Sequence, residues 1–425
     1  MEKKRAIPLL PVGHLLHAIL QRRSFAWILA LAVMIGLGIT TIYRGGFSPS
    51  QRTDLTVFIR AGQALAENEN IYEVTNLKGW NYVYAPLLAV LIKPFHGLPL
   101  SWSVSLWYLL ALLSIGGAFW IGIRLFSTVQ HGLLACSLAA IFSLPLLLNA
   151  ISRGQLGALM LFLQMAVFLL YFRGRKIAAG FLLGFSVVLK ISPLAFVFFF
   201  FLFKKEWKVL FAGILGILFF LFVFPGFFIG FEKNFGFVAE WLRVMQLAMA
   251  DRGNETPLWR QLLTPFLEDN QSGYAVLTRW FWPSDESIYG ESNFGIRLAV
   301  QLFTAGMLGI FFWIAKKSTS RQHVDLLFAE FSLYPLLMLL TAPVAEMHHF
   351  TVLFASAIGI FLLFDQEKLT RAERILFDLA LWSCLLAFTF GLIFDDLAYQ
   401  GIPFLGTFLV FSFQTVFLAL KSDKF

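Results

Sequence analysis

Long apolar runs, each near the length of a membrane-spanning helix, limit what this chain can fold into. A helix needs about 20 consecutive apolar residues to cross a bilayer. Hydrophobic residues make up 59% of the chain and charged residues only 14%, which is more apolar surface than a water-soluble core holds. We therefore expect an all-α polytopic membrane protein. Runs of roughly spanning length lie at 26–43, 101–125, 132–150, 154–172, 207–230, 294–315, 324–342, 349–364, 372–394 and 402–420.

The stretch 177–203 is longer than one span and is interrupted by Lys190-Ile-Ser-Pro193. One tilted helix would place the basic clusters at 173–176 and 204–205 on opposite sides of the membrane. Two short helices meeting at the turn would place both clusters on the same side. Because Pro193 disfavours a continuous helix, we expect the hairpin, which gives about twelve membrane helices.

The distribution of charge predicts which side of the membrane each loop faces. With both termini in the cytoplasm, 20 of the 33 Lys and Arg residues lie on the cytoplasmic side, as do only 9 of the 25 acidic residues. This bias is typical of a multi-pass protein of the plasma (inner) membrane. The net charge is +8, and the charged residues flank the apolar runs. The positive charge therefore indicates contact with membrane lipids and not with nucleic acid.

Two long loops, 44–100 and 231–293, are then non-cytoplasmic, and the chain is expected to form one integral-membrane domain, 1–425. The apolar stretch 84–98 is too short to span and has Pro near both ends, so we expect a short helix in the outer interface. A second interfacial helix is expected near 234–250. No internal repeat is evident, which disfavours a repeat-built transporter.

The unusual polar residues of the chain gather on the non-cytoplasmic side of this topology. Polar groups at the border of many separate helices indicate one shared site on that face. They are Asp54, Arg153, Gln155, Lys190, Asn270, Arg279, His348 and His349.

Each of these residues has a structural and a functional interpretation. Asp54 either caps a short helix or takes a proton from an acceptor hydroxyl. Lys190 and Arg153 either extend to the outer surface or provide cations for a lipid phosphate. His348 and His349 follow Glu346 at a helix mouth. Neighbouring helical residues point about 100° apart, which is poor geometry for a metal, so contact with a phosphate or hydroxyl is favoured. We expect neither a metal nor another cofactor.

Several motifs, in order along the chain, resemble one known family. They are DLTVFIRAGQAL (Asp54 to Leu65) with Ile71-Tyr72, YVYAPLLAVLIKPFHGLP (Tyr82 to Pro99), RGQ (Arg153 to Gln155), GFLLGFSVVLKISP (Gly180 to Pro193), DNQS (Asp269 to Ser272) with Arg279, and the His348-His349 pair. Together they resemble the polyprenyl-phosphate-sugar-dependent glycosyltransferases of C-type architecture that include bacterial phosphatidylinositol-mannoside α-mannosyltransferases. The chain departs from that pattern at Ala85, at Gly157 and in the residues just before His348.

The resemblance implies a membrane glycosyltransferase that moves a hexosyl group, with mannosyl favoured, from a polyprenyl phosphate to a lipid or glycan acceptor on the non-cytoplasmic face. It implies that Asp54 is the catalytic acidic residue and that His348 or His349 is an active-site histidine. An inverting displacement needs a base and a cationic phosphate clamp. The residues expected to bind the donor phosphate or substrate are Tyr84, Arg153, Gln155, Lys190, Asn270, Gln271 and Arg279.

Two other classes of function remain open from the sequence. A lipid or sugar transporter of the cell envelope should carry polar residues at mid-membrane depth and on both faces. A non-catalytic membrane scaffold leaves Lys190 and the histidine pair without a role.

Overall fold

The computed structural model describes residues 34–250 except 50, 52 and 78, together with residues 264–281, 294–317, 324–364 and 371–422. Within these ranges every secondary-structure element is a helix, and β pairing is limited to isolated bridges. The all-α prediction is therefore confirmed for the described part of the chain. Predictions for 26–33 and for 251–263 and 282–293 of the second loop lie outside the described residues.

The helices of the first half of the chain run to the end of the 177–203 stretch. They are η1 (Tyr43–Phe47), α3 (Leu55–Ala66), α4 (Pro86–Ile92), η2 (Lys93–Phe95), α5 (Leu100–Ile123), α6 (Val129–Phe142), α7 (Leu144–Ser152), α8 (Gly157–Phe172), α9 (Lys176–Leu189), α10 (Ile191–Leu194) and α11 (Val197–Phe203).

The helices of the second half follow. They are α12 (Trp207–Leu218), η3 (Phe219–Val223), α13 (Phe224–Ile229), α14 (Phe231–Ala250), α16 (Gly273–Phe281), α17 (Phe294–Lys317), α18 (Val324–Thr341), η5 (Met347–Val352), α19 (Leu353–Phe364), α20 (Arg371–Ile393), α21 (Asp395–Tyr399) and α22 (Ile402–Ser422).

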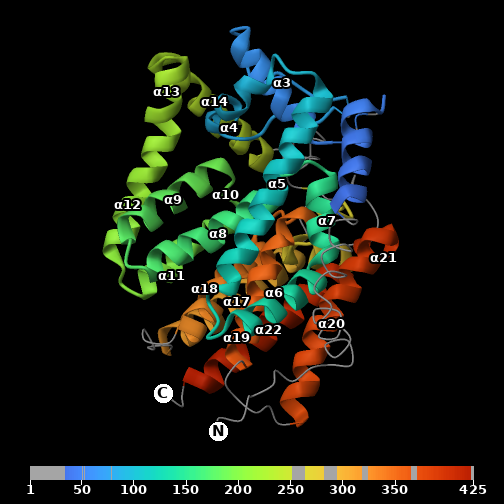
Figure 1. Cartoon of the computed structure of the whole chain (residues 1–425), viewed down its shortest axis with the longest axis vertical. Coiled ribbons are helices and arrows are strands. Elements are labelled where there is room, and N and C mark those ends of the chain that lie inside the picture. Colours follow the sequence, from blue (N-terminus) through green and yellow to red (C-terminus); the bar gives the residue numbers. More distant parts are fainter. Residues whose placement is uncertain are drawn as a thin grey trace.

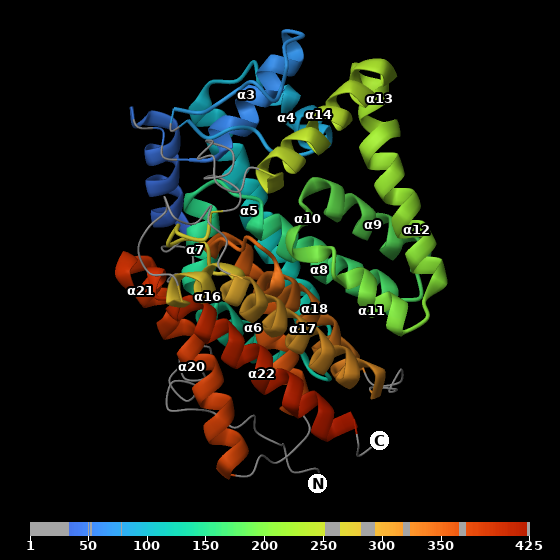
Figure 2. The ribbon, with the colours of Figure 1, turned by 180° about the vertical axis from the view of Figure 1, so that it is seen from behind.

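The helices form a bundle with a cap at one end. Helices α3, α4 and α14 lie at the upper end in both views, and α6, α17, α18, α19 and α22 lie below them (Figures 1 and 2). Helix α18 carries apolar side chains around its circumference, with its buried Glu330 paired to Lys204, and is buried along most of its length against α19, α22 and α10. A helix that is apolar all round belongs in the interior, which explains its central place.

Fewer helices reach spanning length than the twelve expected. Five described helices are long and apolar enough to cross a membrane, or six if the pair α6 and α7, bent by 64°, counts as one span. The bend falls at Ser143, just before Pro145 in the first turn of α7, where proline fits the start of a helix but not its interior. Several other apolar runs include turn residues, so their helices are shorter than the runs.

The outer surfaces of α5 and α12 are apolar. Leu113 on α5 and Phe211 on α12 are 64% and 65% exposed, and Phe227 on α13 is 72% exposed. Rows of exposed large apolar side chains would promote aggregation in water but suit contact with lipid chains. The structure therefore supports a multi-pass membrane protein.

Helices α9 and α12 pack unusually closely through glycine. A Cβ atom on Gly180 would lie 2.2 Å from the carbonyl oxygen of Val209, and one on Gly184 would lie 2.5 Å from that of Gly213. Such contacts leave no room for a larger side chain at these positions. Small residues four apart are a common means of close helix packing in membranes. This contact fixes α9, and with it the residue at its C-terminal end, Lys190.

The stretch 177–203 folds as a hairpin, as predicted. Lys176, at the start of α9, forms an ion pair with Glu206, just after α11, with Nζ and Oε2 2.6 Å apart. The hydroxyl of Tyr171 also donates to Glu206 at 3.1 Å. The two ends of the stretch therefore meet, and the turn at Lys190 lies at the other end of α9.

The helix expected within 84–98 forms, as α4, and it is covered by other parts of the protein. Six of the seven residues of α4 are buried, and the helix packs against α3, α13 and α14. Its residues are apolar on every side, so covering by protein removes more apolar surface than a position at the interface would. The helix expected near 234–250 also forms, as α14.

The hairpin predicts the accessibility of introduced cysteines. Arg175→Cys and Lys205→Cys, both at exposed positions, should react with a membrane-impermeant thiol reagent from the same side, and Ile191→Cys from the opposite side. Labelling in sealed vesicles and in opened ones measures this. The native Cys136 and Cys384 are buried, so they should contribute little background. Reaction of the first two cysteines from opposite sides would contradict the hairpin.

Candidate active site

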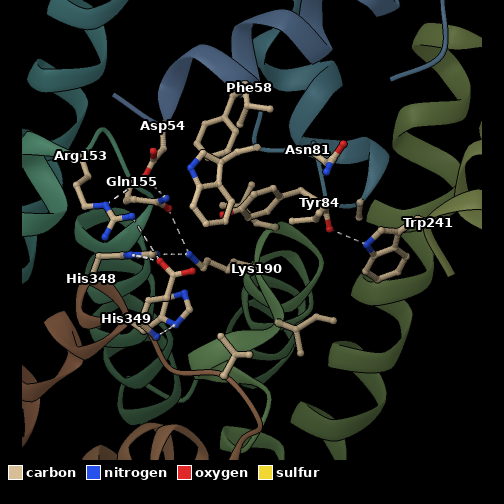
Figure 3. A pocket seen from close by; sticks show the side chains of 18 of the residues that line it. Asp54, Phe58, Asn81, Tyr84, Arg153, Gln155, Lys190, Trp241, His348 and His349 are labelled. Atoms are coloured by element: carbon tan, nitrogen blue, oxygen red, sulfur yellow. Dashed lines mark hydrogen bonds and ion pairs between the residues drawn. The ribbon is translucent and has the colours of Figure 1, made fainter. Parts of the chain in front are cut away.

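A cavity of about 200 Å³ lies where the cap meets the bundle. One water needs roughly 10–15 Å³ by the same kind of measure, so a small organic group fits. The cavity is lined by segments far apart in sequence, and it brings together seven of the ten predicted site residues (Figure 3). These seven are Asp54, Tyr84, Arg153, Gln155, Lys190, His348 and His349.

Asp54 precedes α3, but its carboxylate makes no capping hydrogen bond. The hydroxyl of Thr53 instead accepts from the backbone N–H of Leu55 at 3.3 Å. The Oδ2 atom of Asp54 accepts from Arg153 Nε at 3.2 Å and from Gln155 Nε2 at 2.9 Å. Its Oδ1 atom has no hydrogen-bonding partner among the described side chains and remains available to a ligand. The capping interpretation is therefore contradicted.

The Arg-Gly-Gln turn after α7 brings both partners to Asp54. Gly154 has φ +66°, in the left-handed region that favours glycine. A Cβ atom on it would lie 2.3 Å from Thr53 Oγ1. The backbone N–H of Asp54 donates to the carbonyl of Arg153 at 2.8 Å, which ties the start of α3 to the turn. Glycine thus allows the close contact that sets the geometry around Asp54.

Arg153 bridges three carboxylates. Its guanidinium lies 3.2 Å from Asp54, 2.7 Å from Asp269 and 3.7 Å from Glu346. Burial lowers the pKa of Arg153, but Glu346, Asp54 and Asp269 together raise it by more, so the net shift is upward and the group stays charged. A guanidinium used in this way holds acidic side chains in place and is poorly available to a phosphate.

Lys190 is a buried cation without a counter-ion. It ends α9 and is 9% exposed. Its Nζ atom lies 3.0 Å from His348 Nε2 and 3.5 Å from Gln155 Oε1, and it faces the ring of Tyr84 at 5.7 Å. In the described part of the chain no carboxylate lies within ion-pair distance of it. The ammonium points into the cavity and does not extend to the outer surface. An anionic ligand in the cavity would offset the free-energy cost of burying this charge.

Gln155 connects the acid and the cation. Its amide donates to Asp54 through Nε2 and accepts from Lys190 through Oε1. The carboxylate and the ammonium are therefore separated by the width of one amide group. Burial raises the pKa of Tyr84, with Glu346 and Asp54 adding to the shift, so its phenol stays neutral beside them.

The two histidines present different atoms to the cavity. His349 Nδ1 accepts from the backbone N–H of Glu346 at 3.2 Å, so the ring is neutral and its proton sits on Nε2, which is then a donor. His348 Nε2 accepts from the Lys190 ammonium, so its proton sits on Nδ1, 3.4 Å from Glu346 Oε2. His348 Nδ1 makes no hydrogen bond within the described part of the chain despite this proximity.

Asn270, Gln271 and Arg279, which were also expected to bind substrate, do not line the cavity. Their polar groups bond to backbone. Asn270 donates to the carbonyl of Pro343 and accepts from the N–H of Ala345, and Gln271 donates to the carbonyl of Ala398. Arg279 donates to carbonyls of Pro265, Leu267, Asn270 and Tyr399. These bonds hold the segment before η5 that carries Glu346.

Several cavity residues were not predicted from the sequence. Glu346 is one, although its position beside the two histidines was a usable signal. Burial raises its pKa, while Arg153 and Lys190 oppose the shift. Trp80, Asn81 and Trp241 also line the cavity, and only the structure reveals them, because they lie in the two long loops. No group of three or more potential metal ligands occurs among the residues described.

The fold and the site define a polytopic membrane protein with a partly buried acid and a buried cation that share one cavity. Residues 82–343 match the sequence model of glycosyltransferase family 87. The chain belongs to this family. That membership makes it a glycosyltransferase.

The comparisons with individual proteins show only distant similarity. Two crystal structures of ArnT from Cupriavidus metallidurans, one in the apo state and one bound to undecaprenyl phosphate, are similar to this chain at 14% sequence identity. Their TM-scores are 0.46 and 0.42, and each match covers 94% of this chain and 78% of ArnT. No curated protein sequence matches the chain.

The turn at Gly154 predicts the effect of adding one methyl group. Gly154→Ala should reduce glycosyl transfer at least tenfold, because the new Cβ displaces Thr53 and the adjacent Asp54. Gly174→Ala is the matched control: Gly174 also has a positive φ, +75°, but its Cβ would meet nothing. Both variants should lose about 1 kcal/mol of stability from backbone strain. Thermal unfolding and transfer rates measure the two effects, and equal activities in the two variants would contradict the proposed role of the turn.

Proposed function

We propose that this family 87 enzyme transfers a hexosyl group from a polyprenyl phosphate to a hydroxyl group of a lipid or glycan acceptor, with inversion at the anomeric carbon. The sequence resemblance favours a mannosyl group. One observation carries the proposal: Asp54, with one oxygen unpaired among the described side chains, and Lys190, with no carboxylate of the described residues in ion-pair range, face the same cavity and are linked by Gln155.

Asp54 is the general base in this scheme. Arg153 and Gln155 hold Oδ2, which leaves Oδ1 to accept the proton of the acceptor hydroxyl. The acceptor oxygen forms a bond to the anomeric carbon as the bond from that carbon to the phosphate oxygen breaks. The proton ends on Asp54, and the electron pair of the broken bond leaves with the polyprenyl phosphate.

Lys190 and His349 bind the leaving phosphate in this scheme. The ammonium forms a charge-assisted contact, and the Nε2–H of His349 adds a second donor. One unpaired ammonium suits a donor with a single phosphate. The cavity wall next to Lys190 is apolar, formed by Val188, Leu189 and Ile191, and Ile191 is 44% exposed, which suits a phosphate attached to a lipid chain.

In this proposal the active site faces the non-cytoplasmic side, and the distribution of charge supports that side. The basic cluster at 173–176 begins α9 and Lys190 ends it, so the cavity lies at the opposite end of the hairpin from that cluster. Cytoplasmic loops collect Lys and Arg, so the positive-inside rule supports cytoplasmic basic clusters and an outward-facing cavity. Cytoplasmic termini follow from the same rule.

Replacing the base tests the first half of the mechanism. Asp54→Asn keeps the shape of the side chain but removes its ability to take the proton, so turnover should fall about 100-fold or more, with the fold intact. Asp269→Asn is the matched control, because Asp269 also binds Arg153 but does not line the cavity. It should lose much less activity. Near-normal turnover of a folded Asp54→Asn enzyme, measured as release of polyprenyl phosphate, would exclude Asp54 as the base.

Replacing the cation tests the second half. Lys190→Gln keeps most of the length but removes the charge, so donor binding should weaken by about 1.5–3 kcal/mol, the range for hydrogen bonds to charged groups. Acceptor binding should change little. Lys190→Arg should restore only part of the affinity, since a planar fork does not replace a compact ammonium. Donor titration at fixed acceptor measures all three proteins, and normal donor affinity in Lys190→Gln would remove Lys190 from the clamp.

A further inference from the structure

A small hairpin in the first outer loop presents one aromatic side chain, that of Trp80, and one amide side chain, that of Asn81, to the cavity. It covers residues 74–82, described except for 78. Asn76 N–H donates to the carbonyl of Trp80 at 3.0 Å, and Asn76 Oδ1 accepts from the N–H of Trp80 at 3.1 Å. Thr75 and Asn81 form an antiparallel bridge. The guanidinium of Arg60 on α3 donates to the carbonyl of Thr75. Backbone bonds, one amide and one guanidinium therefore hold the hairpin.

The indole of Trp80 takes no part in holding the hairpin. It is partly exposed and lines the cavity, and it has neither a hydrogen bond nor a ring contact with any residue in the described ranges. A large aromatic side chain normally contributes by packing. An indole that lines a cavity, with no ring contact or side-chain hydrogen bond to the described residues, is available to a ligand.

The aromatic and amide side chains lie together, apart from the charged ones. Figure 3 shows Asn81, Tyr84 and Trp241 on one side of Lys190. Asp54, Arg153, Gln155, His348 and His349 lie on the other side. Trp241 is fixed by a hydrogen bond from its indole N–H to the carbonyl of Val83 at 3.2 Å, so the orientation of its ring is set before any ligand binds.

This combination fits a pyranose. A sugar ring has an apolar face of C–H groups, which packs on an aromatic ring, and a rim of hydroxyls, which exchange hydrogen bonds with an amide. A phosphate has no apolar face to pack on an indole, and a lipid chain has no hydroxyls to exchange hydrogen bonds with an amide, so of these groups a sugar ring alone would use both features. The charged half of the cavity already accounts for the reacting atoms.

We propose that Trp80 and Asn81, with Trp241, form a pyranose-binding wall that selects the sugar in the reaction. The proposal rests on the proposed function for the identity of the reaction, but the binding of a sugar ring is tested separately from it. The pyranose belongs either to the donor or to the acceptor, and both present the same chemistry to the wall.

The test compares ligands that differ only in the sugar. Undecaprenyl phosphate and its mannosyl ester are titrated against wild type, Trp80→Ala and Trp80→Phe, and methyl mannoside is followed by saturation-transfer NMR as a stand-in for an acceptor sugar. Leu77→Ala is the matched control, because Leu77 is 59% exposed on the same hairpin and does not line the cavity. Thermal unfolding verifies that each variant is folded.

Trp80→Ala should weaken binding of a sugar-bearing ligand by roughly five- to tenfold and leave undecaprenyl phosphate unchanged, whereas Trp80→Phe should retain most of the affinity. Loss for the mannosyl ester assigns the wall to the donor sugar, and loss for methyl mannoside assigns it to the acceptor; either supports the proposal. Equal weakening of undecaprenyl phosphate, an equal effect of Leu77→Ala, or no effect on any sugar would overturn it. Failure of the wild-type protein to bind undecaprenyl phosphate would overturn the proposed function instead. In that case the binding of methyl mannoside to wild type and to Trp80→Ala would still test the pyranose-binding wall.

Discussion

The contact between Arg153 and three carboxylates holds the site together. Asp54 comes from the first long loop, Asp269 from the second and Glu346 from the segment before η5, so one guanidinium joins three regions that are distant in sequence. A buried cation or anion alone would be costly, and each is tolerated here because of the others. Removing the guanidinium would therefore release more than one contact, because three acidic groups would be left close to each other with no charge between them.

The rest of the architecture serves to bring Lys190 to this cluster without neutralising it. The glycine contacts between α9 and α12 fix the helix that Lys190 ends, and the turn that follows places its ammonium at the cavity. Its polar neighbours, Gln155 and His348, are neutral. A cation whose neighbours are neutral can still attract an anionic ligand. The charge of Arg153 is instead neutralised by its ion pairs within the protein. The two cations thus have different tasks although both lie in one cavity.

The sequence predicted the helical class, the hairpin and seven of the residues that share the cavity, because these follow from apolar length, from Pro193 and from charges that stand out against an apolar background. It could not reveal contacts between residues that are distant in sequence. Asn270, Gln271 and Arg279 are as polar as Lys190, and only their carbonyl partners show that they hold backbone. The burial of α4 and the bend between α6 and α7 also depend on neighbours, so the apolar runs alone do not predict them.

The amide of Gln155 has a consequence for the movement of charge. In the proposed reaction the negative charge leaves Asp54 as it takes the proton, and a second negative charge appears on the phosphate beside Lys190. Charge therefore shifts across the cavity by about the length of one side-chain amide, while the total within the cavity stays constant. In a medium of low dielectric constant a short displacement of this kind is far less costly than creating a new charge. The enzyme need not admit water or ions to balance the step, so the site can remain closed to both while the reaction proceeds.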